Sequence, residues 1–380
     1  MSVLDEVRAF LADHPANDGD DAAFREAATD AGWLAPTWSR SWYGRELDSH
    51  DAAVVGEEFT RAGRSGRADQ RHLHARIVYS MSTDELKQTY LRGLLTGEMS
   101  GCLLYSEPDA GSDLGSLRTR AVRDGSSWRV DGQKVWTSDA GRADYGLLAA
   151  RTNADVPKHE GITFFVLPMG QDGVRVEPIV QITGDRHFNE VFLTGAVVPD
   201  SFRLSDVDAG WPVLMGALGM ERSVMGDRGL GSRAADPEYV GTDDDLLALA
   251  QRNGRSSDPA TRTQLAGIYA ARAAARLNSA RYADEGRSRD PAAMSMSKLA
   301  MSELLHRTAA LRREVIGAAS LLDEPGGDGA RVNFFTLDAY FTSIGGGTDQ
   351  IQRNIIAERL LGMPKEDDPS RSIPFSQVRR

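Results

Sequence analysis

The order of periodicities along the chain constrains its fold more than any other feature. Residues 1–99 place apolar side chains at three- and four-residue steps, the spacing of amphipathic helices, as in Asp51–Ala62. Residues 100–205 form short apolar or alternating runs between turn residues, which is typical of strands. Helical spacing returns over residues 206–380. The sequence therefore predicts an α+β chain with an N-terminal helical domain (1–99), a middle β-domain (100–205) and a C-terminal helical domain (206–380).

Local signals support the two helical domains. Thr83 precedes two acidic residues and is suited to cap a helix that carries Leu86 and Tyr90 on one face. The C-terminal domain contains Ala-, Arg- and Leu-rich amphipathic stretches, as expected of antiparallel helices in a four-helix bundle. The stretches are Thr261–Glu285, Pro291–Leu322, Val332–Thr342 and Asp349–Leu361, with Gly345–Gly347 between the last two.

The middle domain contains several short candidate strands. Trp128–Trp136 alternates across Asp131-Gly132, a dipeptide that favours a tight hairpin turn. Further apolar runs bounded by turn residues follow at near-regular spacing, including Gly161–Pro168 and Glu190–Pro199. This pattern predicts a compact β-sandwich or barrel.

Composition limits the possible partners. The formal net charge is -11, and an acidic surface repels phosphate backbones, so nucleic acid is not expected to bind. Cys102 is the only cysteine, which excludes an intrachain disulfide and a cysteine-based metal cluster. His72 and His74 lack a carboxylate or cysteine at ligand spacing, so no metal is expected. The N-terminus lacks the apolar core of a signal peptide and no run is long enough to span a membrane, which predicts a cytoplasmic protein.

Three segments carry a resemblance to a known family. Tyr105–Leu117 reads YSEPDAGSDLGSL, Asp131–Ala140 reads DGQKVWTSDA, and Gly346–Arg359 reads GGTDQIQRNIIAER. Each resembles a signature of the acyl-CoA dehydrogenase superfamily, and the three occur in that family's order. The similarity covers Trp33–Lys365. It implies the family's three-domain fold and a flavoenzyme that binds FAD and oxidises a thioester-activated acyl chain.

The resemblance also implies which residues bind FAD. Ser112 matches the position that binds the pyrophosphate, beside Gly111, whose missing side chain lets the backbone approach a phosphate. Ser112 is also a candidate substrate-binding residue. The other implied cofactor contacts are Leu103, Tyr105 and Ser106 along one edge of the flavin, Trp136 and Ser138 behind it, Thr348 and Gln350 from a neighbouring subunit, and Arg252 at the pyrophosphate. Arg255 is an alternative to Arg252, because the sequence that follows Arg252 departs from the family pattern.

The catalytic base is the position where this chain departs most from the family. A carboxylate in a dry pocket suits removal of an acyl α-proton, because desolvation raises its pKa toward neutrality. Many members carry that glutamate at the position of Gly346, which has no side chain. A second subgroup, including isovaleryl- and long-chain-type enzymes and bacterial fatty-acid or sterol side-chain dehydrogenases, carries it early in the C-terminal domain, where this chain has Glu221-Arg222. The resemblance implies Glu221 as base, Arg222 as a substrate-binding residue, and the Gly346 N–H as a donor to the thioester carbonyl.

Three readings of the reaction stay open at this point. The first is a dehydrogenase that forms a trans-2-enoyl thioester and passes electrons to an electron-transfer flavoprotein, with either CoA or a carrier protein holding the acyl group. The second is a flavin-dependent oxygenase or oxidase on the same fold, against which the presence of Glu221 argues. The third is a non-catalytic subunit of a hetero-oligomer. The resemblance implies an oligomer, either a homodimer or homotetramer or an assembly with a related chain.

Overall fold

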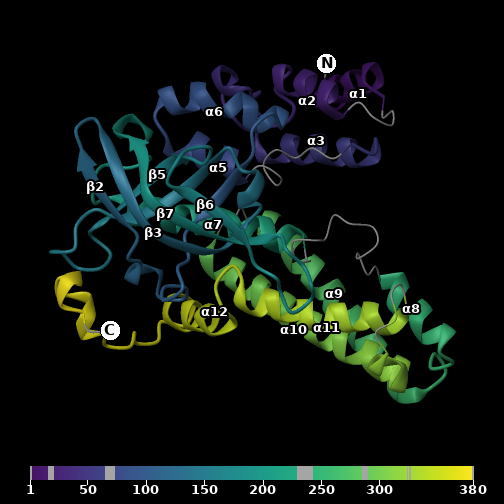
Figure 1. The fold of residues 1–380 in the computed structure, drawn as a ribbon. Helices are drawn as coiled ribbons and strands as arrows, with labels where there is room; N and C mark the ends of the chain where they lie inside the picture. Colours follow the sequence, from purple (N-terminus) through teal and green to yellow (C-terminus); the bar gives the residue numbers. More distant parts are fainter. Residues whose placement is uncertain are drawn as a thin grey trace. The chain divides into compact units, whose positions relative to one another are not determined.

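The computed structural model describes residues 2–15, 21–64, 73–228, 243–284, 290–322, 324 and 327–378. They form two compact units. The first contains Met1–Val180, Asp185–Met220 and Asp368–Arg380, and the second contains Gln181–Gly184 and Glu221–Asp367. The predicted order of helices, strands and helices is confirmed (Figure 1). Among the described residues, no helix has the length and apolar character needed to cross a membrane.

The first unit begins with helices that pack through their apolar faces. Thr83 caps the last of them as predicted, because its side chain accepts a hydrogen bond from the Leu86 N–H. Gly97 ends the same helix in the left-handed conformation, with φ 85°. These helices are α1 (Val3–Asp13), α2 (Asp21–Asp30), α3 (Ser49–Arg61), α5 (Leu73–Met81) and α6 (Asp84–Thr96).

The β-domain is a seven-stranded sheet in the order β1-β4-β2-β3-β7-β6, with β5 also paired to β4. Strand β4 is parallel to both β1 and β2, and the other neighbours are antiparallel. Every residue of β4 is buried, which explains the apolar run Gly146–Ala150 within it. The strands are β1 (Gly101–Leu104), β2 (Arg120–Asp124), β3 (Ser127–Ser138), β4 (Tyr145–Arg151), β5 (Ile162–Pro168), β6 (Val174–Pro178) and β7 (Phe188–Pro199).

The predicted hairpin at Asp131-Gly132 is wrong. Strand β3 continues through both residues and shifts register against β7 between Val130 and Gly132. A Cβ on Gly132 would lie 2.4 Å from the Thr119 Oγ1, so the glycine is required by a close approach of the backbone. The hairpin forms instead between β2 and β3, where Gly125 follows Asp124 and has φ 63°.

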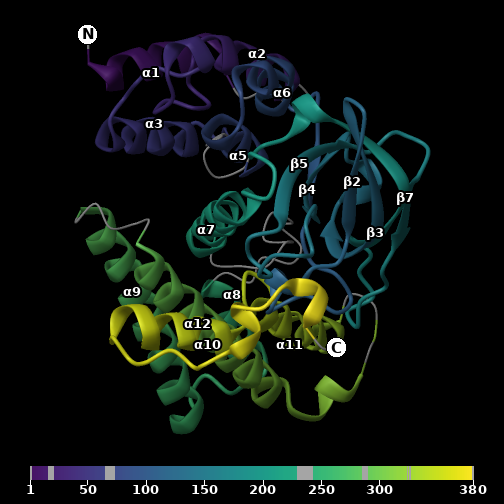
Figure 2. The same cartoon turned by 90° about the vertical axis from the view of Figure 1, so that its left-hand side faces the viewer.

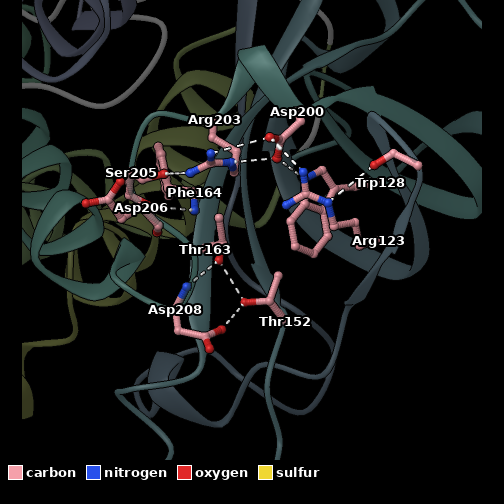
Figure 3. A network of polar contacts seen from close by, with 11 residues as sticks. Arg123, Trp128, Thr152, Thr163, Phe164, Asp200, Arg203, Ser205, Asp206 and Asp208 are labelled. Carbon is pink, nitrogen blue, oxygen red and sulfur yellow. Dashed lines mark hydrogen bonds and ion pairs between the residues drawn. The ribbon is translucent and has the colours of Figure 1, made fainter.

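Polar contacts fasten the end of β7 to the sheet. The Asp200 carboxylate accepts hydrogen bonds from the Trp128 Nε1 at 2.7 Å and the Arg203 Nε at 2.8 Å (Figure 3). Its pKa is lower than usual, chiefly because the Arg203 and Trp128 hydrogen bonds favour the ionised form. Nearby, the Thr163 hydroxyl accepts from the Asp208 N–H at 2.8 Å. The contacts fix the chain where it leaves the sheet and approaches helix α7 (Gly210–Arg228).

The second unit is a bundle of helices, as predicted (Figure 2). Helix α7 is divided between the two units after Met220, and the helices of the second unit that follow it are α8 (Asp243–Arg252), α9 (Pro259–Asp284), α10 (Pro291–Ile316), α11 (Asp328–Ile344) and α12 (Asp349–Ile355). The last predicted helix, Asp349–Leu361, is α-helical only to Ile355 and continues as a π-helical turn over Ile356–Leu360. The core of this unit includes Leu246, Ile268 and Leu311, which are almost completely buried.

The C-terminal residues 368–378 belong to the first unit, where they dock on the β-domain. The Phe375 N–H donates to the Val156 carbonyl at 2.8 Å, and the Phe375 ring lies 3.7 Å from the Arg151 guanidinium. Arg151 is buried and donates to the carbonyls of Leu117, Lys158 and Gly115 at 2.7 to 3.1 Å. Phe375 therefore covers the arginine that organises residues 115–117.

We expect Phe375→Ala to release this C-terminal segment. The ring is only 6% exposed, so its removal should lower the free energy of unfolding of the first unit by about 3 kcal/mol. All six tryptophans lie in this unit, so denaturant unfolding followed by tryptophan fluorescence measures it selectively. Ile373→Ala, which truncates a 36% exposed residue of the same segment, is the control and should change the midpoint little. Equal effects of the two variants would contradict the docking role of Phe375.

Candidate active site

A buried ion pair organises the loop that follows β1. The Lys134 Nζ lies 2.8 Å from the Glu107 Oε1 and also donates to the Tyr105 carbonyl at 3.0 Å. The Glu107 carboxylate further accepts the N–H groups of Arg118 at 2.6 Å and Thr119 at 2.9 Å. Lys134 is 0% and Glu107 is 8% exposed. The pair therefore joins both ends of the loop to strand β3.

The pKa values of this pair show what burial and pairing each do. Burial alone would raise the pKa of Glu107, but the Lys134 ammonium and the hydrogen bonds outweigh it and hold the pKa below its usual value. The pKa of Lys134 is also lowered, because desolvation outweighs the attraction of Glu107. The ion pair was missed from the sequence, although Glu107 and Lys134 lie in the two quoted β-domain motifs and carry opposite charges.

Four of the predicted cofactor residues, Leu103, Tyr105, Ser106 and Ser112, lie in or next to this loop. Leu103 is half-buried in β1, and the Tyr105 ring is in the core, 5.6 Å from the Phe164 ring. The Ser106 carbonyl accepts the Val135 N–H at 2.9 Å, which holds the loop against β3. Ser112 is exposed beyond the turn. A Cβ on the neighbouring Gly111 would meet no described atom within 4 Å, so the space beside this turn is open to a ligand.

Trp136 has the conformation expected of a functional residue. It lies near the end of β3 with φ 60°, a left-handed conformation that is unfavourable for an aromatic residue. Its side chain is 57% exposed and meets only one other aromatic ring among the described residues, edge-on, that of Phe188 at 5.9 Å. Ser138 is exposed two residues farther along the same strand. An exposed indole with a hydroxyl on the same face fits one side of a flat, polar-rimmed ring such as a flavin.

Basic side chains support the Ser112 turn from behind. The Lys158 Nζ lies 3.0 Å from the Asp113 Oδ2 and 3.4 Å from the Asp368 Oδ2, and Lys158 is buried. A Cβ on Gly115 would lie 2.7 Å from the His159 Nε2, so this part of the loop requires glycine. The Lys158 ammonium is paired with the Asp113 and Asp368 carboxylates, so it holds the turn in place without adding net positive charge. These first-unit residues fit the pyrophosphate and ring of FAD.

The second unit contains the glycine loop between α11 and α12. Gly346 and Gly347 have φ 63° and 86°, and the Gln352 Nε2 donates to their carbonyls at 3.0 and 3.2 Å. The Thr348 Oγ1 caps α12 by accepting the Ile351 N–H at 3.2 Å. This bond uses an oxygen lone pair, so the hydroxyl keeps its hydrogen as a donor. Gln350 is exposed on the first turn of α12.

No side chain at 346 offers a carboxylate, and the next one along the loop is already engaged. Asp349 lies 2.8 Å from the Lys298 Nζ and 2.8 Å from the Ser302 Oγ. Burial opposes ionisation of Asp349, but these hydrogen bonds outweigh it and lower its pKa. A lowered pKa makes Asp349 a poor acceptor for a carbon acid's proton.

The remaining predicted site residues lie on helices of the bundle. Glu221 is half-buried on α7, and the side chain of Arg222 lies outside the described residues. Arg252, the last residue of α8, forms an ion pair with Asp328 at 3.2 Å, and the alternative Arg255 lies 3.6 Å from Asp258. Both arginines therefore have carboxylate partners within the bundle.

Burial alters the reactivity of two other side chains in the described part of the chain. Burial lowers the pKa of His74 to about 4 and raises that of Cys102 to about 12, which makes the histidine a neutral core residue and the thiol inert. His72 lies outside the described residues. Within the described ranges, no group of histidine, cysteine and acidic side chains is arranged to hold a metal ion.

Comparisons with known proteins cover most of the chain. Family profiles described as the acyl-CoA dehydrogenase N-terminal, middle and C-terminal domains match residues 2–98, 102–195 and 208–361. Two solved structures are similar over 96% of this chain and 97% of their own. They are the Tcur3481-Tcur3483 steroid ACAD, with TM-score 0.75 and 27% identity, and the ChsE4-ChsE5 complex from Mycobacterium tuberculosis, with TM-score 0.74 and 28% identity.

Named relatives give the same result. The acyl-CoA dehydrogenase IpdE1 of Mycobacterium tuberculosis is 31% identical over 346 residues, 90% of this chain and 88% of the relative. The acyl-CoA dehydrogenase FadE34 of the same organism is 34% identical over 343 residues, 89% of this chain but 46% of the relative, so the chain spans about half of FadE34. The predicted resemblance is confirmed over nearly the whole sequence. The chain belongs to the acyl-CoA dehydrogenase family.

Proposed function

We propose that this chain catalyses α,β-dehydrogenation of an acyl-CoA thioester, with Glu221 as the base that removes the α-proton. One observation carries the assignment of the base. Gly346 has no carboxylate at the position many relatives use, and Asp349 is neutralised by Lys298. Glu221 is half-buried on α7, and the Glu-Arg pair in which it stands matches the alternative position of the base. The test is whether an acyl-CoA reduces the bound flavin without oxygen, and whether that reduction requires Glu221.

Four residues of this chain have distinct tasks in the proposed reaction: Glu221, Gly346, Ser112 and Trp136. FAD, when bound, accepts the β-hydride. The Glu221 carboxylate accepts the α-proton, so that one proton and one hydride leave and a trans-2-enoyl thioester remains. The Gly346 N–H donates to the thioester carbonyl and stabilises the negative charge that develops on its oxygen. Ser112 would bind the pyrophosphate of FAD, and the exposed indole of Trp136 would pack against one side of its flavin ring.

We expect Trp136→Ala to weaken cofactor retention with little effect on the protein without cofactor. The indole is 57% exposed, so its truncation removes little packing and also relieves little strain, and the unfolding free energy should change by less than about 1 kcal/mol. Loss of the indole face should raise the FAD dissociation constant by about tenfold or more. Trp128→Phe is the control, because Trp128 is 4% exposed in the core and should affect stability instead. Unchanged FAD affinity in Trp136→Ala would contradict the placement of the flavin.

The acceptor and the acyl group are narrower proposals. We infer that an electron-transfer flavoprotein accepts the electrons from the reduced flavin. We also infer that the acyl carrier is CoA, since the relatives FadE34 and IpdE1 are named acyl-CoA dehydrogenases. One similar structure is described as a steroid ACAD, so a polycyclic acyl-CoA is the first substrate to test. An oxygenase or oxidase would instead consume oxygen in step with substrate. The cytoplasmic location stays a prediction.

We infer that the working form is an oligomer. The second unit exposes large apolar side chains near the C-terminal end of α11 and in the segment that follows α12. They are Tyr340, Ile344, Leu361 and Met363, which are 54 to 66% exposed. Both structures named above carry the names of two chains, which makes a related second chain a candidate partner. Counting FAD per protomer of the purified chain decides between the forms. A ratio near one supports a homo-oligomer, and a ratio near zero that rises with a related chain supports a hetero-oligomer.

A further inference from the structure

One face of α10 carries three polar side chains at four-residue steps: Lys298, Ser302 and His306. All three reach residues at the two ends of the glycine loop. Ser343 lies in the last turn of α11, before the loop, and Asp349 is the first residue of α12, after it. Lys298 is 1% and Ser302 is 0% exposed, so these are contacts of the interior of the second unit.

The contacts form one continuous chain of hydrogen bonds. The Ser302 Oγ lies 2.8 Å from the Asp349 Oδ2 and 2.9 Å from the Ser343 Oγ, and the Ser343 Oγ lies 2.6 Å from the His306 Nε2. The Asp349 carboxylate only accepts, so the single Ser302 hydrogen points to Asp349. Ser343 must then donate to Ser302, and the His306 Nε2–H must donate to Ser343. This direction requires a hydrogen on the His306 Nε2.

The arrangement closes the glycine loop at its base. A single hydroxyl, that of Ser302, bridges the residue before the loop and the residue after it. The Lys298 Nζ holds the other oxygen of Asp349 at 2.8 Å. Between these ends, Gln352 holds the carbonyls of Gly346 and Gly347. Three successive glycines have the widest choice of backbone conformations, so without such contacts the direction of the Gly346 N–H would be poorly defined.

We propose that Ser302 and Lys298 are positioning residues that fix the Gly346 N–H for the thioester carbonyl, acting through Ser343 and Asp349. The proposal rests on the function proposed above. Preorganised donors act on developing charge because they need no reorganisation during the reaction. Loss of the bridge should therefore affect carbonyl recognition and kcat, while binding of the CoA and acyl portions stays the same.

The test uses two unreactive ligands of the holoenzyme that differ only in the carbonyl. One is a 3-thia-acyl-CoA, which keeps the thioester carbonyl, and the other is the 3-thia-alkyl-CoA thioether of the same length, in which a CH2 group replaces that carbonyl. In Ser302→Ala we expect the dissociation constant of the thioester to rise about tenfold, the value of one lost hydrogen bond, and that of the thioether to stay unchanged. Ser302→Thr, which keeps a hydroxyl, should restore the preference. Thr308→Val is the matched control, because it removes a buried α10 hydroxyl that has no hydrogen-bond partner among the described residues.

A second measurement reports on the loop itself in the protein without acyl ligand. Amide hydrogen exchange over residues 343–352 should be faster in Ser302→Ala and in Lys298→Met, and unchanged in Thr308→Val. Lys298→Arg keeps the charge and covers the case in which Lys298→Met fails to fold. Faster exchange with an unchanged thioester preference would overturn the positioning role. If the wild-type protein binds the thioester and the thioether equally well, the proposed function fails. The positioning role then fails too, even if the exchange result shows that Ser302 holds the loop.

Discussion

We expect Glu221→Gln to lower the rate of flavin reduction by acyl-CoA by about 10²- to 10⁴-fold, the usual effect of removing a general base. Glutamine matches glutamate in size, so the variant should keep the fold of α7 and its bound FAD. The measurement is anaerobic stopped-flow reduction at saturating acyl-CoA, which reads proton and hydride removal without the steps that reoxidise the flavin. In the described glycine loop no carboxylate is free to replace Glu221, because position 346 is glycine and Asp349 is held by Lys298.

A second readout separates the base from a residue that only shapes the pocket. Exchange of the α-hydrogen of an unreactive 3-thia-acyl-CoA with solvent deuterium needs the base but no hydride transfer. Glu221→Gln should stop this exchange, whereas Glu303→Gln, which changes an exposed glutamate on α10, should leave it intact. If Glu221→Gln exchanges the α-hydrogen and reduces the flavin at wild-type rates, Glu221 is not the base.

Lys134→Met is the substitution with the largest expected effect on stability. It leaves the carboxylate of Glu107 buried with no cation and the Tyr105 carbonyl without its donor. Breaking a buried ion pair from one side typically costs about 3–5 kcal/mol, because the remaining charge is uncompensated. Tryptophan fluorescence should show a much lower denaturant midpoint for the first unit. FAD binding should also weaken, since the same pair fixes the loop that leads to Ser112.

Two further variants show whether the effect comes from the unpaired charge. Lys134→Met combined with Glu107→Gln removes that charge while an amide oxygen still accepts the Thr119 N–H, so part of the stability should return. Arg129→Met breaks the ion pair with Asp124, in which both side chains are 59% exposed. It should change the free energy of unfolding by less than about 1 kcal/mol. A double variant no more stable than Lys134→Met alone would show that the unpaired Glu107 charge is not the cause.

The sequence predicted local structure well where a single residue determines it. Thr83 caps a helix because its own side chain meets the N–H three residues later, which spacing alone reveals. Asp131-Gly132 misled because a glycine needed for a close approach to Thr119 looks the same in sequence as a turn glycine. The true turn, at Asp124-Gly125, had the same dipeptide. Only the register of β3 against β7 distinguishes them, and register is a tertiary property.

The candidate site was predictable in its residue types and less so in its supports. The motifs indicated Trp136 and Ser112, but the φ of 60° at Trp136 follows from the irregular pairing of β3 with β7 between Lys134 and Thr137. Lys134 and Glu107 are 27 residues apart, and Lys298 and Asp349 are 51 apart, so no local pattern joins them. The docking of Phe375 on Arg151 likewise joins the C-terminus to the middle of the chain. Such contacts depend on which elements pack together, and their buried charges become informative only when the partner is seen.

Anaerobic titration of the purified flavoprotein with a panel of acyl-CoA thioesters, polycyclic acyl groups included, tests the central claim most directly. The account predicts a yellow protein whose visible flavin absorbance is bleached by at least one acyl-CoA, with one enoyl thioester formed for each flavin reduced. A preparation that stays colourless after FAD and a related partner chain are supplied would contradict it. So would a yellow protein that no acyl-CoA in the panel reduces.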